Sequence, residues 1–334
     1  MIPLNPWADA ESALPYDRLE FGDRWLLVAG PERALIDRLG TTYVRLDDRR
    51  LTRGILVGIQ TSADAIYHLK KRGPGRYLCE PKGKDAQPFE VRVEDALMKP
   101  LVSGAEAQRY VEPRTETFLL FPYRVGPDGA TLIPADEMAS QFPLAWAYLR
   151  SWESELRGRE NRAFDDGQWW RFGRHQNLDK QEIPKLIVPR LVVSVSCSVD
   201  EAGTSYLDNV DVGGVVPADG VLPHFLAAIL NAPVADFVFR RISKPFRGDF
   251  RSANRQFIAP LPIPNASDDD RAVVAERAQR LQVLHTERRG GQPTVKSRWL
   301  WRLETLVAGA GRELPSRPEV LAWARALDAP PEAI

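Results

Sequence analysis

The segment RLTRGILVGIQTSADAIYHLKKRGPGRYLCEP, residues 50–81, decides the fold class of this chain. It holds two apolar, β-branched runs that are separated by polar turn residues and closed by Gly-Pro-Gly, a pattern typical of paired strands on a curved sheet. Gly54 and Gly58 flank the run at 55–57, where glycine permits a bulge or a close approach by another backbone. The segment therefore predicts a fold built around β-structure.

Strands and helices are predicted on both sides of this segment. Residues 117–123 and 185–196 read as strands, the second with Pro189 at an edge or a bulge. Residues 257–264 read as an extended, proline-stiffened stretch. Helical spacing of apolar residues, or proline and glycine at the ends, predicts helices at 31–39, 142–162, 221–241, from 268 through 289, 296–307 and 318–327.

The run at 221–241 is expected to form two helices, because Asn231 can cap the second and Pro233 fits its first turn. A short apolar run at 25–29 suggests a further strand. The predicted fold class is α+β: a twisted mixed β-sheet over about residues 25–264 with flanking helices and a C-terminal helical tail.

Composition restricts the function. The 334 residues include 45 Lys and Arg against 45 Asp and Glu, so any contact with nucleic acid has to rest on a local patch of charge. The two cysteines are too few for a disulfide framework or a zinc cluster, and the four histidines lack metal-ligand spacing. Neither a secretory signal nor a run of about 20 apolar residues occurs, so we expect a cytoplasmic protein without membrane contact.

Three clusters of basic residues supply such local charge. The stretch WWRFGRHQNL, residues 169–178, combines aromatic rings, cations and amides, and residues 239–257 place six basic residues beside one acid with two phenylalanines interleaved. Residues 70–76, KKRGPGR, form the third cluster. Cations neutralise phosphates, and the amides of Gln176, Asn177, Asn254 and Gln256 can bind an adenine edge bidentately. The alternative is that these are solvated charges, buried tryptophan anchors and turn-forming amides.

Motifs of catalysis do not stand out. The sequence has no Gly-X-Ser-X-Gly, no Gly-X4-Gly-Lys-Ser/Thr and no His-Glu-X-X-His, and Gly309-Ala310-Gly311 follows a predicted helix instead of a strand. The residues alone therefore leave open whether the chain is part of an enzyme.

The order of several short segments resembles a known family. These segments are RGILVGIQT (53–61), KPLVSG (99–104), LFPY (120–123), ELRGRENR (155–162), WWRFGRHQNL (169–178), PKLIVP (184–189), AILNA (228–232) and QFIAPLPIP (256–264). The order is similar to the TaqI-like C-terminal specificity, or target-recognition, domain of adenine-N6 DNA methyltransferases and fused restriction-modification enzymes. The resemblance divides the chain into a leader or linker at 1–40, the recognition domain at 41–265, and a helical tail at 266–334 that is a possible partner interface.

The resemblance implies a module that recognises a short sequence in double-stranded DNA and presents an adenine to a catalytic domain, which flips the base. The family's catalytic domain binds S-adenosylmethionine and carries an Asn/Asp-Pro-Pro-aromatic motif. Asn5-Pro6-Trp7 lacks the second proline, and Pro330-Pro331 lies between Ala329 and Glu332. We therefore expect no cofactor, metal or catalytic residue in this chain, with S-adenosylmethionine bound by a partner methyltransferase or methyltransferase-nuclease subunit. A split gene product and a fragment of a longer enzyme are the alternatives.

Carried over by position, the resemblance implies two sets of DNA-binding residues for a phage-defence or other restriction-modification system. The expected phosphate contacts are Arg174, Lys185, Arg247, Arg251 and Arg255. The expected base or stacking contacts are Arg53, Gln60, Thr61, Trp169, Trp170, Arg171, Gln176, Asn177 and Asn254. The alternative function is an interaction or scaffold protein that keeps the fold but no longer reads DNA.

Overall fold

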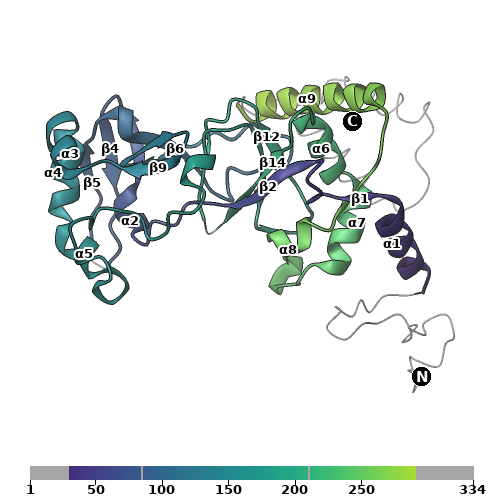
Figure 1. The fold of residues 1–334 in the computed structure, drawn as a ribbon, viewed down its shortest axis with the longest axis horizontal. Helices are drawn as coiled ribbons and strands as arrows, with labels where there is room; N and C mark the ends of the chain where they lie inside the picture. Colours follow the sequence, from purple (N-terminus) through teal and green to yellow (C-terminus); the bar gives the residue numbers. More distant parts are fainter. Residues whose placement is uncertain (1–29, 84–85, 210, 291–334) are drawn as a thin grey trace, which may run out of the picture. The chain divides into compact units, whose positions relative to one another are not determined.

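A computed structural model describes residues 30–83, 86–209 and 211–290 of the chain. The chain divides into two compact units, residues 1–282 and 283–334. Only the end of one helix, residues 283–290, belongs to the described part of the second unit. The first unit contains the strands and helices that position the candidate site (Figure 1).

One antiparallel sheet of the first unit has the strand order β12-β10-β14-β2. Its strands are β2 (Thr52–Val57), β10 (Lys185–Pro189), β12 (Ser198–Asp200) and β14 (Val212–Pro217). Leu186, Val188 and Val215 point from this sheet into a core that α6 (Pro223–Leu230), α7 (Pro233–Ile242) and α8 (Arg255–Ile258) complete. Pro189 lies beyond the residues that pair with β12, so its missing N–H leaves no gap in that ladder.

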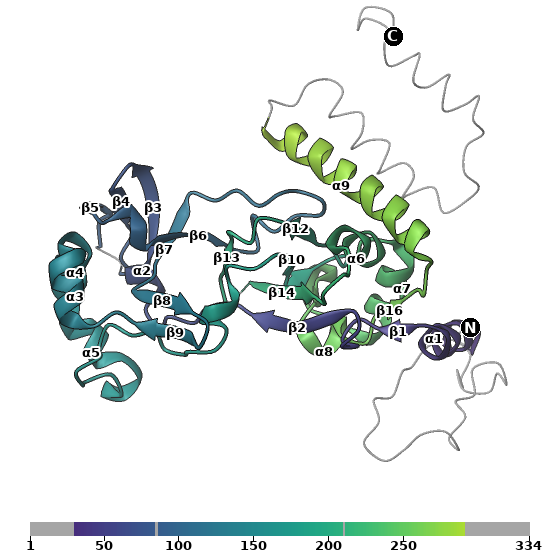
Figure 2. The same cartoon turned by 45° about the horizontal axis from the view of Figure 1, so that its top comes forward.

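A second sheet has the order β13-β6-β7-β3-β4-β5, and its only parallel pair is β13 with β6 among the strands described. The strands are β3 (His68–Gly73), β4 (Arg76–Cys79), β5 (Phe89–Arg92), β6 (Met98–Val102), β7 (Thr117–Leu120) and β13 (Tyr206–Leu207). Its core includes residues of α3 (Ala135–Gln141), α4 (Pro143–Ser151) and α5 (Glu153–Arg162), which lie beside the sheet (Figure 2). A small cluster that includes Ile187 and Leu207 connects the two sheets.

Short elements complete the unit. Three two-stranded pairs are β1 (Val44–Arg45) with β16 (Pro262–Ile263), β8 (Tyr123–Gly126) with β9 (Gly129–Leu132), and β11 (Leu191–Val192) with β15 (Arg251–Ser252). The remaining helices are α1 (Gly30–Thr42), α2 (Asp64–Tyr67), η3 (Asp95–Leu97), η4 (Leu178–Lys180), η5 (Arg247–Asp249) and α9 (Asp268–Gly290). No helix in the described ranges is both long and apolar enough to cross a membrane.

The structure confirms the α+β class but divides the expected single sheet. The predicted strands of residues 50–81 do not all pair with one another: β2 joins the four-stranded sheet, whereas β3 and β4 form a hairpin in the six-stranded one. The close approach expected at Gly58 is confirmed, since a Cβ there would lie 2.4 Å from the backbone of Leu207 and Asp208. At Gly54 the nearest atom would lie 3.9 Å away.

Several predicted boundaries are corrected. The helix expected at 142–162 is broken at Trp152, and the strand expected at 117–123 ends at Leu120. Asn231 does not cap α7, because its amide instead bonds to the backbone N–H and C=O of Cys197, and Ala232 occupies the N-cap. Helix α9 confirms the predicted start of the tail, while the elements predicted at 25–29, 296–307 and 318–327 lie outside the described residues.

Candidate DNA interface

The candidate site begins where two distant stretches of backbone join. The amides of Gly173 and Arg174 donate to the carbonyls of Thr61 and Gln60, at 3.0 and 3.2 Å. A Cβ on Gly173 would lie 1.9 Å from the hydroxyl of Ser62, so only glycine allows this approach without movement. The loop 173–177 is therefore held along the segment that follows β2.

The polar side chains of this loop differ in accessibility. Asn177 has a left-handed backbone, with φ of 60°, and its Nδ2 donates to the carbonyl of Val57 at the end of β2. Gln176 is exposed and forms no side-chain hydrogen bond with any residue in the described part of the chain. Arg174 is exposed and forms an ion pair with Glu160 at 3.2 Å. Such an exposed pair contributes little to stability, about 0–1 kcal/mol, so a phosphate can replace Glu160 at low cost.

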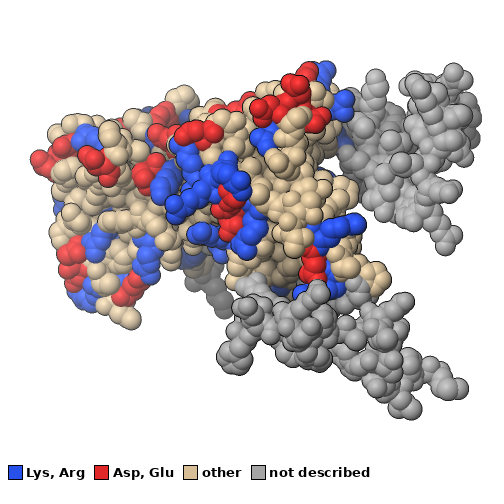
Figure 3. Space-filling model, turned by 45° about the vertical axis from the view of Figure 1, so that its right-hand side comes forward, with Lys and Arg blue, Asp and Glu red and all other residues tan. Residues whose placement is uncertain are grey.

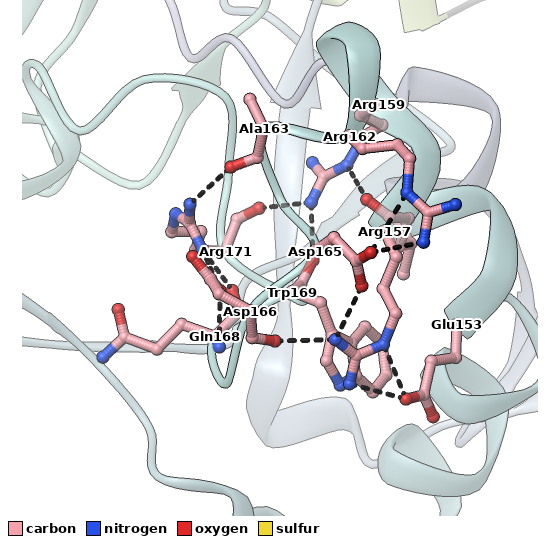
Figure 4. Close-up of polar contacts among 11 residues, drawn as sticks. Glu153, Arg157, Arg159, Arg162, Ala163, Asp165, Asp166, Gln168, Trp169 and Arg171 are labelled. Atoms are coloured by element: carbon pink, nitrogen blue, oxygen red, sulfur yellow. Dashed lines mark hydrogen bonds and ion pairs between the residues drawn. The ribbon is translucent and has the colours of Figure 1, made fainter.

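A buried arginine fixes the base of the loop. Arg159 Nη1 donates to the Thr61 carbonyl at 2.8 Å, Nη2 donates to the carbonyls of Trp169 and Arg171 at 2.6 and 2.9 Å, and Nε donates to Leu156. Burial lowers the pKa of Arg159, but a guanidinium keeps its proton in proteins. Figure 4 shows this guanidinium bonded to the segment that carries Trp169 and Arg171, which precedes the loop 173–177. Arg159 therefore joins Thr61 to the tryptophan pair.

The two tryptophans are buried anchors and not stacking platforms for a nucleic acid. Trp169 stacks on Trp146 with ring centroids 5.4 Å apart, and Trp170 meets the same ring edge-on at 5.1 Å. The indole N–H of Trp170 donates to the carbonyl of Ile133 at 3.2 Å. Both side chains are nearly inaccessible, with exposed fractions of 4% and 3%. This placement corrects the expectation that they contact DNA.

Arg171 is also engaged within the protein. Its Nη1 pairs with Asp166 at 2.6 Å, and its Nη2 donates to the carbonyl of Ala163 at 3.2 Å. The bond from Arg171, together with a backbone N–H of Gln168, lowers the pKa of Asp166. Figure 4 also shows Arg157, which pairs with Asp165 and donates to the carbonyl of Asp166. Asp165 and Asp166 therefore connect α5 to the segment that leads into the loop 173–177.

A pocket of about 540 Å³ opens at the end of β2. Val57, which accepts the bond from Asn177, lines the pocket together with its strand neighbours Ile55 and Leu56. The lining also includes four side chains with hydrogen-bond donors, Arg45, Arg190, Asn254 and Arg255. Its acid, Asp47, pairs with Arg45. Val57 thus links the loop 173–177 to a recess rich in hydrogen-bond donors.

Arg190 is held in position inside this recess. Its Nε donates to Asn254 Oδ1 at 2.8 Å, and Nη1 donates to the carbonyl of Asn209. Because Arg190 uses one of the two lone pairs of the amide oxygen and fixes its direction, the Nδ2 of Asn254 is the group that this arrangement leaves as a donor. Arg255 is exposed at the rim, in the first turn of α8. The recess therefore favours an acceptor such as a phosphate oxygen.

Three other predicted residues are placed differently. Lys185 has no exposed side-chain surface, and its Nζ pairs with Asp200 at 2.9 Å, so it stabilises the core and does not reach a phosphate. Burial is the main reason that its pKa is lowered. Thr61 is buried, and its hydroxyl pairs with Asp64 at 2.5 Å. Arg53 forms an exposed ion pair with Asp219 and lies four residues, about 13 Å, before Val57 on the same strand.

The remaining basic clusters differ in how far acids neutralise them. In 70–76, Lys70, Lys71 and Arg76 pair with Glu80, Asp95 and Glu90. Arg247 is exposed in η5, Arg251 is half-buried in β15, and neither lines the pocket. Figure 3 shows basic side chains gathered on one face of the protein with acidic ones among them. Within the described residues, no group of three or more potential metal ligands is found.

The structure identifies residues that sequence reasoning overlooked. Arg159 and Arg190 were not singled out, although each positions part of the site. Glu160, Asn161 and Arg162, which follow Arg159, all have positive φ and interrupt α5. Asparagine favours that conformation, so Asn161 is the residue in the sequence that indicates a helix end next to Arg159.

The chain resembles a known protein in sequence. Over 233 residues the chain is 26% identical to the type II restriction enzyme and methyltransferase RM.Eco57I of Escherichia coli. The chain is related to a restriction-modification enzyme. The match covers 64% of this chain but 22% of that protein, so the chain spans about a fifth of its relative's length. No protein-family model matches the chain.

Proposed function

We propose that this chain is the DNA target-recognition module of a restriction-modification system, of the TaqI-like type that serves adenine-N6 methylation. The observation that carries the proposal is the junction at the end of β2. There Val57 lies between the loop with Arg174, Gln176 and Asn177 and the recess that Arg190 lines. The relationship to RM.Eco57I, which unites restriction and methylation in one protein, supports the same reading.

The proposed division of labour follows from accessibility. Arg174 and Arg255 are exposed cations that can pair with phosphates, whereas Gln176 is an exposed amide that can reach a base edge. Asn177 and Asn254 are half-buried. Asn177 bonds the loop 173–177 to Val57, and Asn254 positions Arg190 in the recess. Methyl transfer and S-adenosylmethionine binding are assigned to a methyltransferase or methyltransferase-nuclease partner.

The test measures binding of the chain to labelled duplex DNA by fluorescence anisotropy at several salt concentrations. Replacing Arg174 and Arg255 together by alanine is expected to weaken binding to every sequence and to reduce the slope of log K against log salt by about 2, since each phosphate contact contributes about 0.9. Gln176→Ala is expected to relax preference at one base pair, by about 1–3 kcal/mol. Arg150→Ala, which removes an exposed arginine of helix α4, is the matched control.

The alternative, a scaffold protein, predicts different data. Duplex binding that is absent, or that has the same salt slope in the double variant as in the parent, would contradict the DNA-reading role. Capture of a catalytic subunit without any DNA binding would then favour the scaffold.

A further inference from the structure

Residues 244–251 form a hairpin in the connection between α7 and α8, the two helices labelled in Figure 1. The Phe246 amide donates to the Phe250 carbonyl at 2.7 Å, and Pro245 forms a bridge with Arg251. Gly248 and Asp249 turn the chain at its tip, with φ of 75° and 62°. Strand β15 attaches the base of the hairpin to β11. The hairpin therefore has a defined backbone.

The hairpin exposes aromatic surface that the fold does not cover. Phe246 and Phe250 are 48% and 40% exposed. Leu191 and Val193 are also exposed, at 52% and 43%, on or next to the strand that pairs with the hairpin's base. Exposed apolar surface that gathers in one place usually marks a binding site, since burying it elsewhere would stabilise the protein.

The charges around these rings are predominantly positive. Asp249 is the acid of the hairpin, and Arg240 neutralises it at 2.8 Å. Lys244 lies over the ring of Phe246, with its Nζ 5.6 Å from the ring centroid, and Arg247 is exposed at the tip. Arg251 at the base donates to a backbone carbonyl and forms no ion pair with a described residue. Lys244, Arg247 and Arg251 thus belong to the same hairpin as the two phenyl rings, and none of the three forms an ion pair with an acid in the described part of the chain.

We propose that the hairpin is a wedge that inserts Phe246 or Phe250 between base pairs of the bound DNA, with Lys244 and Arg247 on the flanking phosphates. Inserted apolar side chains partly unstack a base step and kink the duplex by about 20–90°. The excess of three cations over one acid in residues 244–251 favours a polyanion over a protein surface, and exposed side chains on a narrow hairpin can enter a groove. This inference rests on the proposed function, because it requires that the chain bind DNA.

The experiment measures DNA bending by energy transfer between dyes at the two ends of a duplex, with the binding affinity measured in parallel. The parent chain is expected to shorten the distance between the dyes. Phe246→Ala combined with Phe250→Ala is expected to abolish the bend and to weaken binding about tenfold, in keeping with the energy of one aromatic-base stack. Phe246→Leu with Phe250→Leu keeps apolar side chains and is expected to retain part of the bend.

A matched control is available on another strand. Phe89 in β5 is 41% exposed, close to the value for Phe250, and lies in the six-stranded sheet. Phe89→Ala is expected to bend and bind DNA as the parent does. Thermal unfolding of each variant shows whether a loss of bending comes from the missing rings or from an unfolded protein. If the double alanine variant is unfolded, the double leucine variant is compared with the parent instead.

Different failures identify different errors. If the parent binds no duplex, the proposed function fails and the wedge with it. If the parent binds and bends DNA and the folded alanine pair does so equally, the wedge is refuted while the DNA-reading role stands. If the alanine pair retains bending but no longer associates with a catalytic subunit, the hairpin is a protein contact and the inference is overturned.

Discussion

Replacing Arg159 by methionine tests whether one buried guanidinium holds the candidate recognition loop. Methionine keeps much of the side-chain length but has no N–H donor. In the parent, Arg159 donates to four carbonyls, of which those of Trp169 and Arg171 lie in the segment that leads into the loop 173–177. The Thr61 carbonyl keeps a second donor, the amide of Gly173, at 3.0 Å.

The magnitude follows from the groups left without a partner. Each buried carbonyl without a donor costs about 1–3 kcal/mol, and the variant removes the donor that serves Trp169 and Arg171. The variant also removes a buried charge whose desolvation opposed folding, as the lowered pKa of Arg159 indicates. We expect the free energy of unfolding to fall by about 3 kcal/mol.

Urea unfolding, followed by the fluorescence of the buried tryptophans, measures this change. Arg162→Met is the matched control, because Arg162 is exposed and pairs only with Asp165 among the contacts of the described residues, so its loss is expected to cost less than about 1 kcal/mol. DNA binding by Arg159→Met is expected to weaken because the loop loses its anchor. A loss of stability below about 1 kcal/mol, or equal to that of the control, would refute the anchoring role.

Substitutions test three further features. Gly58→Ala is expected to lower the free energy of unfolding by about 1–3 kcal/mol because its Cβ would meet backbone at 2.4 Å, whereas Gly54→Ala has 3.9 Å of room; equal chemical-denaturation midpoints would contradict this. Lys185→Met leaves a buried carboxylate without its cation, so calorimetry is expected to show a loss of about 3–5 kcal/mol. Asp48, bonded by Arg50, has its pKa lowered to about 2. Its stabilising contribution is present above pH 3.8 and is lost as the pH falls through 2, and Arg50→Ala should return the carboxyl's NMR titration midpoint toward 3.8.

The candidate site depends on residues that are far apart in the chain. The segment after β2, the loop 173–177 and the start of α8 contribute polar groups, and backbone hydrogen bonds and Asn177 connect the first two. Substituting a buried support such as Arg159 should therefore affect DNA binding without touching DNA. A binding assay should be read together with a stability measurement for each variant.

The sequence by itself determined the α+β class and the start of the C-terminal helix, whereas the contact with Leu207 and Asp208 that requires glycine at residue 58 and not at residue 54 appeared only in the structure. Local patterns suffice for these features, because strand alternation, helical spacing and helix-end residues act over a few neighbouring positions. The basic clusters at 169–178 and 239–257 were also visible as residue types. Their exposure was not.

Only the tertiary structure decided which of these residues are accessible. Trp169, Trp170 and Lys185 belong to the core, whereas Arg174 and Gln176 remain exposed, although all five lie within 17 consecutive positions. Their difference arises from distant partners, such as Trp146 and Asp200, whose positions are set by packing and sheet register. Sequence identifies a cation or a ring, but the free energy of burying it depends on what the folded chain places beside it.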